Sequence, residues 1–483
     1  MRFVILGYGA VGQGLPPVLG RLLGIAPERI TAISADVSAD EQALARRQGI
    51  TLHAATIRAD SDLGLLSRHL NAGDALINVS VGVCSLSLIH WCQSHGVIYL
   101  DTCLEPWAGA YEAQGLTNHA LRQRVLQEAG GPGHPTAAIV CGANPGLVSH
   151  FIAQGLQDWA RGRGLEKGLE KRLAAPTDAS PDRGEYPAGT AASSAHRAHA
   201  LKVHTVQIAE TDTQTLGRPL AEGEFANTWS VVGLLSEADQ PCEIGLGTSD
   251  RLLQSLPPDA IAHRTDNSVT LSAPGAHVRA RTWTPSAGPC EGLCITHHEV
   301  ISTAHHLSLR ATPGGPLLWR PSVCYAYHAS PSTRESLDRR LKAGIPRWRL
   351  PSLRTRFIGS RDDEFDELGA LLIADHGMHW CGSRLTVGEA RACVPDNGPT
   401  VLQVNAGIAA SLQWAIDHPS RGVVEPEQMD SGSILRIAMP LLGRYTSMTM
   451  PADPCLLGAA PLRRLDSVRQ VALAMNDRLE TLP

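Results

Sequence analysis

The sequence predicts an α/β protein, in which an amino-terminal, doubly wound parallel sheet is followed by an α+β domain with a large mixed or antiparallel sheet. Three observations predict this. The chain opens on a short apolar run, Phe3 to Leu6, that leads directly into a glycine-rich turn and a Leu-rich segment. Apolar runs then alternate with segments of helical spacing as far as residue 146, which is typical of a parallel sheet with helices on both faces. Beyond residue 203, most apolar runs have the length of strands.

The glycine-rich turn has the pattern Gly-x-Gly-x-x-Gly at Gly7, Gly9 and Gly12, with Ala10 and Val11 before the last glycine. In such a turn the first glycine allows a tight bend, the second lets a pyrophosphate approach the backbone, and the third lets helix and strand pack closely. Glycine is frequent here, at 46 of 483 residues, so a turn that binds nothing is the alternative. The flanking strand and helix favour a Rossmann-type domain that binds a dinucleotide.

Length and composition indicate a globular chain with two or three domains. The 42 basic and 47 acidic residues give a net charge of −5, and no basic run would follow a phosphate backbone, which argues against nucleic acid as a partner. No stretch approaches 18 consecutive apolar residues, and the amino terminus enters a strand at once, so we expect a cytoplasmic protein without a membrane partner. The eleven cysteines include no Cys-x-x-Cys pair, which argues against a disulfide framework or a structural zinc site.

The dinucleotide-binding domain is expected to span residues 1–146. Its later strands and helices are predicted at 29–34, 40–49, 75–81, 86–95, 97–101 and 137–140, with a further helix at 147–159. Ligands of such sheets lie outside the carboxyl ends of the strands. The candidate cofactor contacts at these ends are Ser34, Ser80, Asp101 and Thr102.

The choice of dinucleotide depends on the end of the second strand. An Asp or Glu usually stands there against the ribose hydroxyls, but this chain has Ser34, with Asp36 two residues further on. No Arg follows directly to bind a 2′-phosphate. We therefore expect NAD rather than NADP.

Residues 147–389 are expected to form the substrate-binding, catalytic and dimerisation domain. Its predicted strands are 203–210, 226–235, 278–283, 294–302 and 323–327. Within it, residues 161–200 are rich in Gly, Ala, Ser, Pro and charge, so we expect a mobile insertion that is either a solvated loop or a lid.

The carboxyl-terminal part of the chain is expected to return to the earlier domains. A helix is predicted at 406–418 and a short connector at 423–427, and part of 390–425 is expected to join the first domain. The remainder, 426–483, is expected to return to the catalytic domain.

Several acidic residues lie inside otherwise apolar segments, where a carboxylate needs a partner or a purpose. These are Glu105, Glu210, Glu237, Glu299 and Asp366. Trp229 stands among them, and the face of an indole attracts cations. Together they suit a diamine or polyamine, although each has a plainer alternative as a turn cap or a core residue. His297, His298 and Glu299 are not expected to bind metal, because adjacent residues of a strand point to opposite faces.

Several long motifs, in one order along nearly the whole chain, resemble those of bacterial homospermidine synthases, which belong to the saccharopine dehydrogenase-like group. The motifs are Tyr99-Leu-Asp-Thr-Cys-Leu-Glu-Pro-Trp107, Cys141-Gly-Ala-Asn-Pro-Gly146, Asn227-Thr-Trp-Ser-Val231, Arg320-Pro321 with Cys324-Tyr-Ala-Tyr-His328, and Asp366-Glu-Leu-Gly369.

This resemblance implies an aminobutyl transferase that holds NAD as a recycled hydride carrier. Putrescine is oxidised to an iminium, the amine of a second putrescine or another diamine attacks it with release of ammonia, and the new imine is reduced to homospermidine. The resemblance places Trp229 beside the iminium and assigns the other catalytic roles to Glu210, Glu237, His297 and Glu299. It assigns substrate binding to Glu105, Asn144 and Asp366, cofactor contact also to Asn144, and implies a homodimer.

The chain departs from this family at three positions. Gly82 stands where an Asp is common, Ser34 where an Asp is expected, and His298 where an Asn is usual. These departures bear on the choice of amine more than on the class of reaction.

Two other functions compete with the transferase. One is a reductive-amination dehydrogenase of the same fold, of the carboxyspermidine- or opine-forming type, which consumes NAD(P)H. It would need basic residues for a substrate carboxylate, where the matched motifs supply acids and Trp229. The other is a non-catalytic homologue that binds NAD or polyamines.

Overall fold

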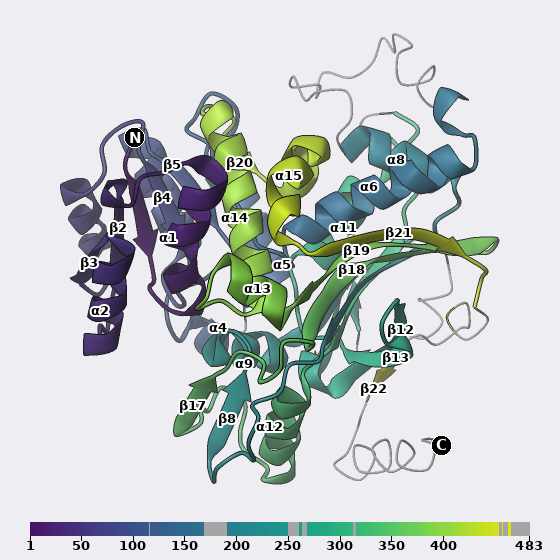
Figure 1. The fold of residues 1–483 in the computed structure, drawn as a ribbon. Coiled ribbons are helices and arrows are strands. Elements are labelled where there is room, and N and C mark those ends of the chain that lie inside the picture. The colour runs from purple at the N-terminus through teal and green to yellow at the C-terminus, as the bar shows by residue number, and fades with distance from the viewer. Residues whose placement is uncertain are drawn as a thin grey trace.

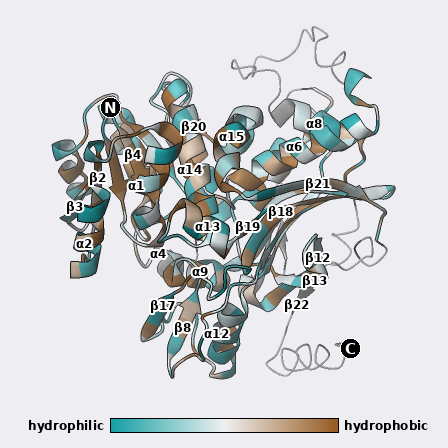
Figure 2. Cartoon of the chain, in the orientation of Figure 1, coloured by the Kyte–Doolittle hydropathy of each residue, from teal (hydrophilic) through white to brown (hydrophobic). Residues whose placement is uncertain are grey.

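The computed structural model of the chain describes residues 1–114, 116–168, 191–249, 260–262, 268–312, 315–453, 456 and 462–464. Two sheets lie side by side, and α14 (Pro399–Asp417) runs between them (Figure 1). This helix contacts α1 (Ala10–Leu23) on one side and strands of the second sheet on the other. The apolar strands of the first sheet lie between polar-faced helices (Figure 2).

In the described part of the chain, the amino-terminal sheet has seven strands, and every neighbouring pair is parallel. Strand β1 lies inside it, with β2 and β4 on its two sides, so the turn after β1 opens where the strand order reverses. In spatial order the strands are β20 (Val423–Val424), β6 (Ala137–Ala138), β5 (Ile98–Asp101), β4 (Ala75–Asn78), β1 (Phe3–Leu6), β2 (Ile30–Ser34) and β3 (Thr51–Ala54).

Helices cover both faces of this sheet, as expected for a doubly wound fold. Besides α1 and α14 they include α2 (Ala39–Gln48), α3 (Ser85–His95) and α5 (Asn118–Glu128), and α4 (Ala110–Gln114) lies between β5 and α5 in the chain. Helix α13 (Val387–Cys393) contacts α14 and β19 (Gly377–Thr386), and α15 (Ser431–Ala438) contacts α14 and α6 (Leu147–Gly162). Short 3₁₀ segments lie at Pro27–Arg29, Asp60–Arg68, Pro426–Gln428 and Met439–Leu441. Side-chain caps start several of them, and α2 begins with a capping box between Ser38 and Glu41.

One correction concerns residues 423–427, which the sequence indicates as a connector. Val423 and Val424 pair with Ala137 and Ala138 and add the edge strand β20 to the first sheet. The two-residue strand is too short for a periodic signal, so its pairing could not be seen locally. Beyond it, β21 (Arg444–Met450) pairs with the second sheet.

The second sheet is mixed. Its main path is β10 (Ile261–Ala262), β11 (Ser268–Pro274), β9 (Pro241–Gly245), β16 (Ser322–His328), β7 (Thr205–Asp212), β18 (Phe365–Ala374), β19 (Gly377–Thr386) and β21, and off this path are β12 (Val278–Thr284), β13 (Gly288–Leu293) and β22 (Leu462–Arg464). Strands β16 and β7 run parallel, whereas β18 is antiparallel to β7. Small two-stranded sheets pair β8 (Glu224–Asn227) with β17 (Leu353–Arg356) and β14 (Leu309–Arg310) with β15 (Leu317–Trp319).

Two of the predicted strands are wrong. The segment 226–235 leaves its strand at Asn227 and enters α9 (Val231–Asp239), because Ser230 accepts a hydrogen bond from the Gly233 amide and caps the helix. The segment 294–302 follows β13 and enters α11 (Glu299–His306). In both places a short apolar run continues without a break into a helix, and periodicity does not separate the two.

Residues 161–200 are partly helical. Helix α6 (Leu147–Gly162) is followed by α8 (Ala191–Ala200), which packs on it and buries Ala195 and Ala198. Ala195 and Ala198 are therefore exceptions to the expectation that residues 161–200 bury little apolar surface. The remainder of the predicted insertion, 169–190, lies outside the described residues. Helix α12 (Pro331–Lys342) completes the second domain, and among the described helices none is long and apolar enough to cross a membrane.

Candidate active site

The glycine turn after β1 leaves room for a ligand at one glycine only. A Cβ on Gly7, whose φ is +99°, would lie 2.8 Å from the Val79 carbonyl oxygen, and one on Gly12 would lie 2.1 Å from the Gly7 carbonyl oxygen. A Cβ on Gly9 would meet no atom within 4 Å. The first and third glycines thus allow the close packing of the turn, and the second faces open space at the amino-terminal end of α1, where a pyrophosphate would accept hydrogen bonds from the backbone.

The carboxyl-terminal edge of the first sheet, where the glycine turn lies, also carries three of the other predicted cofactor contacts. Ser80 follows Val79 beside Gly7 and donates its hydroxyl to Asn78 Oδ1 over 2.6 Å. Ser34 and Thr102 are partly exposed at the ends of β2 and β5. Of these three residues, Ser80 is the one that the structure places directly beside the glycine turn.

Asp101 differs from the other three, because it is fully buried. Its carboxylate accepts hydrogen bonds from the Val140 amide over 2.6 Å and from the Tyr99 hydroxyl over 2.8 Å. Burial raises the pKa of Asp101 to about 7 despite these bonds. Its visible role is to join β5 to the segment after β6, and its contact with a cofactor stays a prediction.

Two side chains from distant parts of the chain hold Glu210. Asn144, in the loop before α6, donates its side-chain amide to Glu210 Oε2 over 2.7 Å, and the Tyr325 hydroxyl donates to the same oxygen over 2.5 Å. Burial raises the pKa of Glu210, and the two hydrogen bonds oppose that rise. Two of the predicted site residues, Asn144 and Glu210, are therefore in direct contact.

His297 lies between two carboxylates. Its Nδ1 is 3.0 Å from Glu299 Oε1, and its Nε2 is 3.1 Å from Glu237 Oε2. Burial lowers the pKa of His297, but Glu299 and Glu237 outweigh burial and raise the pKa well above its usual value. The imidazole ring packs on Tyr325 at 4.2 Å between ring centroids, so His297 and Glu210 share a neighbour. The imidazolium can pass a proton to an ionised Glu237, and the neutral imidazole can take one back from the protonated Glu237.

Asp366 adds a further carboxylate from the neighbouring strand. Strand β18 pairs with β7 so that Asp366 lies opposite Asp212 and Leu368 opposite Glu210. Thr400 donates its hydroxyl to Asp366 Oδ2, and Asp366 Oδ1 is buried with no hydrogen-bond partner. Burial and the charges of Glu210 and Asp212 raise the pKa of Asp366 well above its usual value.

Trp229 precedes α9, the helix that carries Glu237. A Cβ on Gly233 would lie 2.7 Å from the Trp229 ring, so the indole rests on the first turn of this helix, where only a glycine leaves it room. Trp229 is half-buried and packs against the main core, and its indole also neighbours Tyr327. One ring face is thus supported by α9, which fixes the orientation of the indole.

Glu105 lies across from the second-domain acids, in the segment after β5. Its Oε2 accepts a hydrogen bond from the Gly82 amide over 3.2 Å, and Cys103 Sγ lies 3.7 Å from its Oε1. Burial raises the pKa of Glu105 to about 7, and the charges of Glu237 and Asp101 add to the rise.

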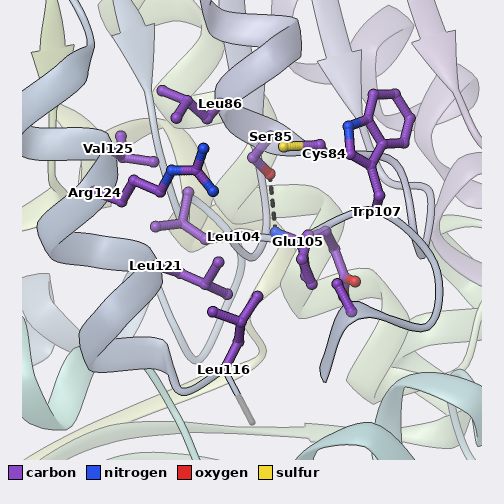
Figure 3. A pocket seen from close by; sticks show the side chains of 12 residues that line it. Cys84, Ser85, Leu86, Leu104, Glu105, Trp107, Leu116, Leu121, Arg124 and Val125 are labelled. Carbon is purple, nitrogen blue, oxygen red and sulfur yellow. Dashed lines mark hydrogen bonds between the residues drawn. The ribbon is translucent and has the colours of Figure 1, made fainter. Parts of the chain in front are cut away.

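A small pocket lies beside Glu105 (Figure 3). Arg124 and Val125 reach it from α5, and Trp107 reaches it from the segment after Glu105. Ser85 Oγ accepts a hydrogen bond from the Glu105 amide over 3.0 Å and holds this segment in place. Apolar side chains form most of the remaining wall.

The predicted acids have in common that none forms an ion pair with Lys or Arg within the described part of the chain. This holds for Glu105, Glu210, Glu237, Glu299 and Asp366. Burial raises the pKa values of four of these carboxyls, Glu105, Glu210, Glu237 and Asp366, and when ionised they attract cations. The site is therefore suited to the ammonium groups of an amine.

Tyr325 is the site residue that the sequence did not single out. It lies within a motif used for the family resemblance, but its contacts with Glu210 and His297 depend on the pairing of strands far apart in the chain. His297, His298 and Glu299 form a turn and the start of α11 rather than a strand. The expectation that their side chains alternate between opposite faces is therefore wrong. Within the described residues, no cluster of three His, Cys, Asp or Glu side chains could hold a metal ion.

Comparison with known proteins identifies the family. Residues 3–131 match the model of the saccharopine dehydrogenase NADP binding domain, and residues 142–450 match that of the saccharopine dehydrogenase C-terminal domain. The chain is 34% identical to the homospermidine synthase of Blastochloris viridis, over 91% of this chain and 89% of that protein, and 34% identical to that of Mesorhizobium japonicum, over 93% and 91%. The crystal structure of the Legionella pneumophila homospermidine synthase in complex with NAD matches with a TM-score of 0.79 at 37% identity, covering 92% of this chain and 91% of that one. The chain therefore belongs to the homospermidine synthase family, within the saccharopine dehydrogenase-like group.

Proposed function

We propose that the protein is an aminobutyl transferase of the homospermidine synthase type, which joins two putrescine molecules, or putrescine and another diamine, and releases ammonia. The observation that supports this most directly is the set of buried and half-buried carboxylates without Lys or Arg partners around His297, among them Glu237 and Glu299. When ionised, these carboxylates attract the ammonium groups of a diamine and repel a substrate carboxylate.

The glycine turn fits a dinucleotide. Gly9 faces open space at the start of α1, and Gly7 and Gly12 close the turn behind it. The Legionella relative was crystallised with NAD, and we take NAD as the dinucleotide here. When bound, NAD supplies hydride chemistry: it accepts a hydride from the carbon that bears the amine and returns it at the end, so net redox change is zero.

The carboxylates hold the ammonium ends of the substrate. Glu210 Oε1 accepts no hydrogen bond from the described part of the chain, because Asn144 and Tyr325 both bind Oε2. Asp366 Oδ1 is likewise without a partner. These two oxygens come from adjacent strands and can receive one ammonium group, while Glu105 receives another from the opposite side.

His297 and Glu237 carry out the proton transfers of the reaction, and Glu299 orients His297. The attacking amine must be neutral, so an ionised Glu237 takes its proton. When the C–N bond to the original amine breaks, that nitrogen leaves as ammonia after receiving a proton from the His297–Glu237 pair. Glu299 holds the other ring nitrogen and keeps the imidazole oriented.

Trp229 stabilises the cationic carbon between these steps. An iminium carries its positive charge at the carbon that is attacked, and an indole face beside it stabilises that charge by about 1–2 kcal/mol. The support of the ring by α9 keeps the face in place without rearrangement during the reaction.

One assay tests the proposed function. Purified protein is incubated with putrescine and NAD⁺, and homospermidine, ammonia and NADH are quantified. We expect homospermidine and ammonia in equal amounts with no accumulation of NADH. Stoichiometric NADH would indicate a net dehydrogenase, and NAD binding without a product from any diamine would indicate a non-catalytic homologue.

A homodimer in the cytoplasm remains our prediction for the assembly and its location. Light scattering coupled to gel filtration checks the first, since a dimer would have twice the mass of the 51.5 kDa chain. Fractionation of cells that express the protein checks the second.

A further inference from the structure

Glu425 is the centre of a buried ionic cluster outside the site described above. Arg122 of α5 binds it with two hydrogen bonds, each 2.7 Å long. His298 Nε2 lies 2.9 Å from Oε1, and His306 Nε2 lies 2.8 Å from Oε2. Arg122, Glu425 and His298 are each at most 3% exposed. One carboxylate thus joins α5 of the first domain to both ends of α11.

Glu427, two residues further on, binds the middle of the same helix. Its Oε1 accepts hydrogen bonds from the hydroxyls of Ser302 over 2.8 Å and Thr303 over 2.9 Å. It also accepts one from Ser149 of α6 over 3.0 Å. We call Glu425, Glu427 and these partners the α11 clasp.

The α11 residues of the clasp share one face. His298, Ser302 and His306 are spaced four residues apart, and Thr303 is adjacent to Ser302. The clasp therefore holds the helix along its whole length of eight residues and sets both its rotation and its position.

The active-site residues stand on either side of the first clasp residue. His297 and Glu299 flank His298, and the His297 ring contacts Glu299 on one side and Glu237 on the other. A rotation at the start of α11 would move His297, His298 and Glu299 together. The bond between His298 and Glu425 therefore determines where the His297 ring can lie.

We propose that Glu425 and Glu427 are positioning residues for the reaction, which hold α11 so that His297 and Glu299 meet Glu237. This inference rests on the proposed function for its kinetic consequences. It assigns a role to the segment 423–427, which the sequence indicated only as a connector and which also forms the edge strand β20.

The charge state of the clasp suits a permanent anchor. Burial alone would raise the pKa of Glu425, but Arg122 and the hydrogen bonds from His298 and His306 hold it well below its usual value. The carboxylate is therefore ionised at neutral pH and can accept these hydrogen bonds.

The test compares Glu427→Gln and Glu425→Gln with a matched control, Glu335→Gln, which removes the exposed ion pair with Arg339 on α12. Glu425→Gln leaves the buried Arg122 uncompensated and can prevent folding. Glu427→Gln and the milder Ser302→Ala remove only part of the clasp. We expect these variants to fold, so their kinetics test the proposal even if Glu425→Gln does not fold. Thermal unfolding and the Kd for NAD are measured for each variant.

The kinetic readouts are kcat and the ratio of the two products that the iminium can form. In a misaligned site, water takes the place of the second amine, which gives an aldehyde and ammonia and leaves NADH behind. For Glu427→Gln we expect kcat to fall about tenfold, with the ratio of NADH to homospermidine rising and the Kd for NAD within about twofold. A role in stability alone would lower the unfolding temperature while leaving kcat per folded enzyme and the product ratio as in wild type, and this result would overturn the proposal.

A second readout separates this inference from the proposed function. The titration of His297 is followed by NMR in the absence of substrate. If the clasp positions His297 between its carboxylates, its pKa falls in Glu427→Gln and is unchanged in Glu335→Gln. An unchanged His297 pKa in both variants overturns the clasp, whether or not the wild-type protein forms homospermidine.

Discussion

The Tyr325 hydroxyl donates to Glu210 Oε2 over 2.5 Å, from the strand that runs parallel to that of Glu210. The register places Tyr327, not Tyr325, directly opposite Glu210, so the long Tyr325 side chain reaches diagonally across the strand pair. With Asn144 on the same oxygen, Glu210 is oriented by two side chains and keeps Oε1 for a substrate ammonium.

Removal of that hydroxyl should change the pH dependence of the reaction. The Tyr325 hydrogen bond lowers the pKa of Glu210, so Tyr325→Phe raises this pKa further. Less of Glu210 is then ionised at a given pH, and the acidic limb of the kcat/KM profile for putrescine moves to higher pH. The loss of one hydrogen bond to a charged group predicts about a 10- to 100-fold fall in kcat/KM at neutral pH. Tyr445→Phe, which loses its contact with Cys381, is the control. An unshifted limb in Tyr325→Phe would contradict this role.

Trp229 should act through the face of its ring. Trp229→Ala removes the cation–π interaction and predicts a fall in kcat of about 5- to 30-fold, whereas Trp229→Phe keeps a weaker face and predicts an intermediate value. Trp319→Phe, which alters the ring beside Lys202 away from this site, serves as the control. Full turnover by Trp229→Ala would exclude the cation–π role.

Glu105 should make diamine binding depend on pH near neutrality. Its pKa is raised to about 7, so the carboxyl is protonated below that pH and can no longer pair with an ammonium group. The KM for putrescine is therefore expected to rise as the pH falls from about 8 to about 6. In Glu105→Gln the KM is high throughout this range and its pH dependence is reduced, while Glu128→Gln on the exposed face of α5 behaves as wild type. A wild-type KM profile in Glu105→Gln would exclude Glu105 from amine binding.

The parts of the fold that depend on local pattern were predictable from the sequence. The run Phe3 to Leu6 forms a strand, the glycine turn follows it, and the predicted helices at 40–49 and 86–95 lie within about one residue of their true bounds. The errors at 226–235 and 294–302 fall where a strand-like run enters a helix directly. The capping role of Ser230 is visible in the sequence afterwards, but a Ser after a Trp is too common to mark a helix start by itself.

The site was predictable in its residue types but not in its contacts. Buried acids such as Glu210 and Glu237 stand out because a carboxylate inside an apolar run needs a partner. The bond between Tyr325 and Glu210 depends on a parallel pairing of strands more than 100 residues apart, which no local signal encodes. Glu425 was missed for a similar reason, because its partners Arg122 and His298 come from distant helices.

Substitutions in the glycine turn should separate effects on folding from effects on cofactor binding. At Gly9 the backbone has φ −80° and ψ −153°, which any residue adopts, and an added Cβ meets no protein atom. Gly9→Ala is therefore expected to keep the wild-type unfolding temperature without NAD. Its methyl group occupies the space where a pyrophosphate would approach the backbone, so the Kd for NAD should rise about tenfold or more. Gly12→Ala, whose Cβ would lie 2.1 Å from the Gly7 carbonyl oxygen, should lose stability as well as NAD binding. Calorimetric titration and thermal unfolding of both variants check this, and wild-type NAD affinity in Gly9→Ala would show that the dinucleotide does not bind over this turn.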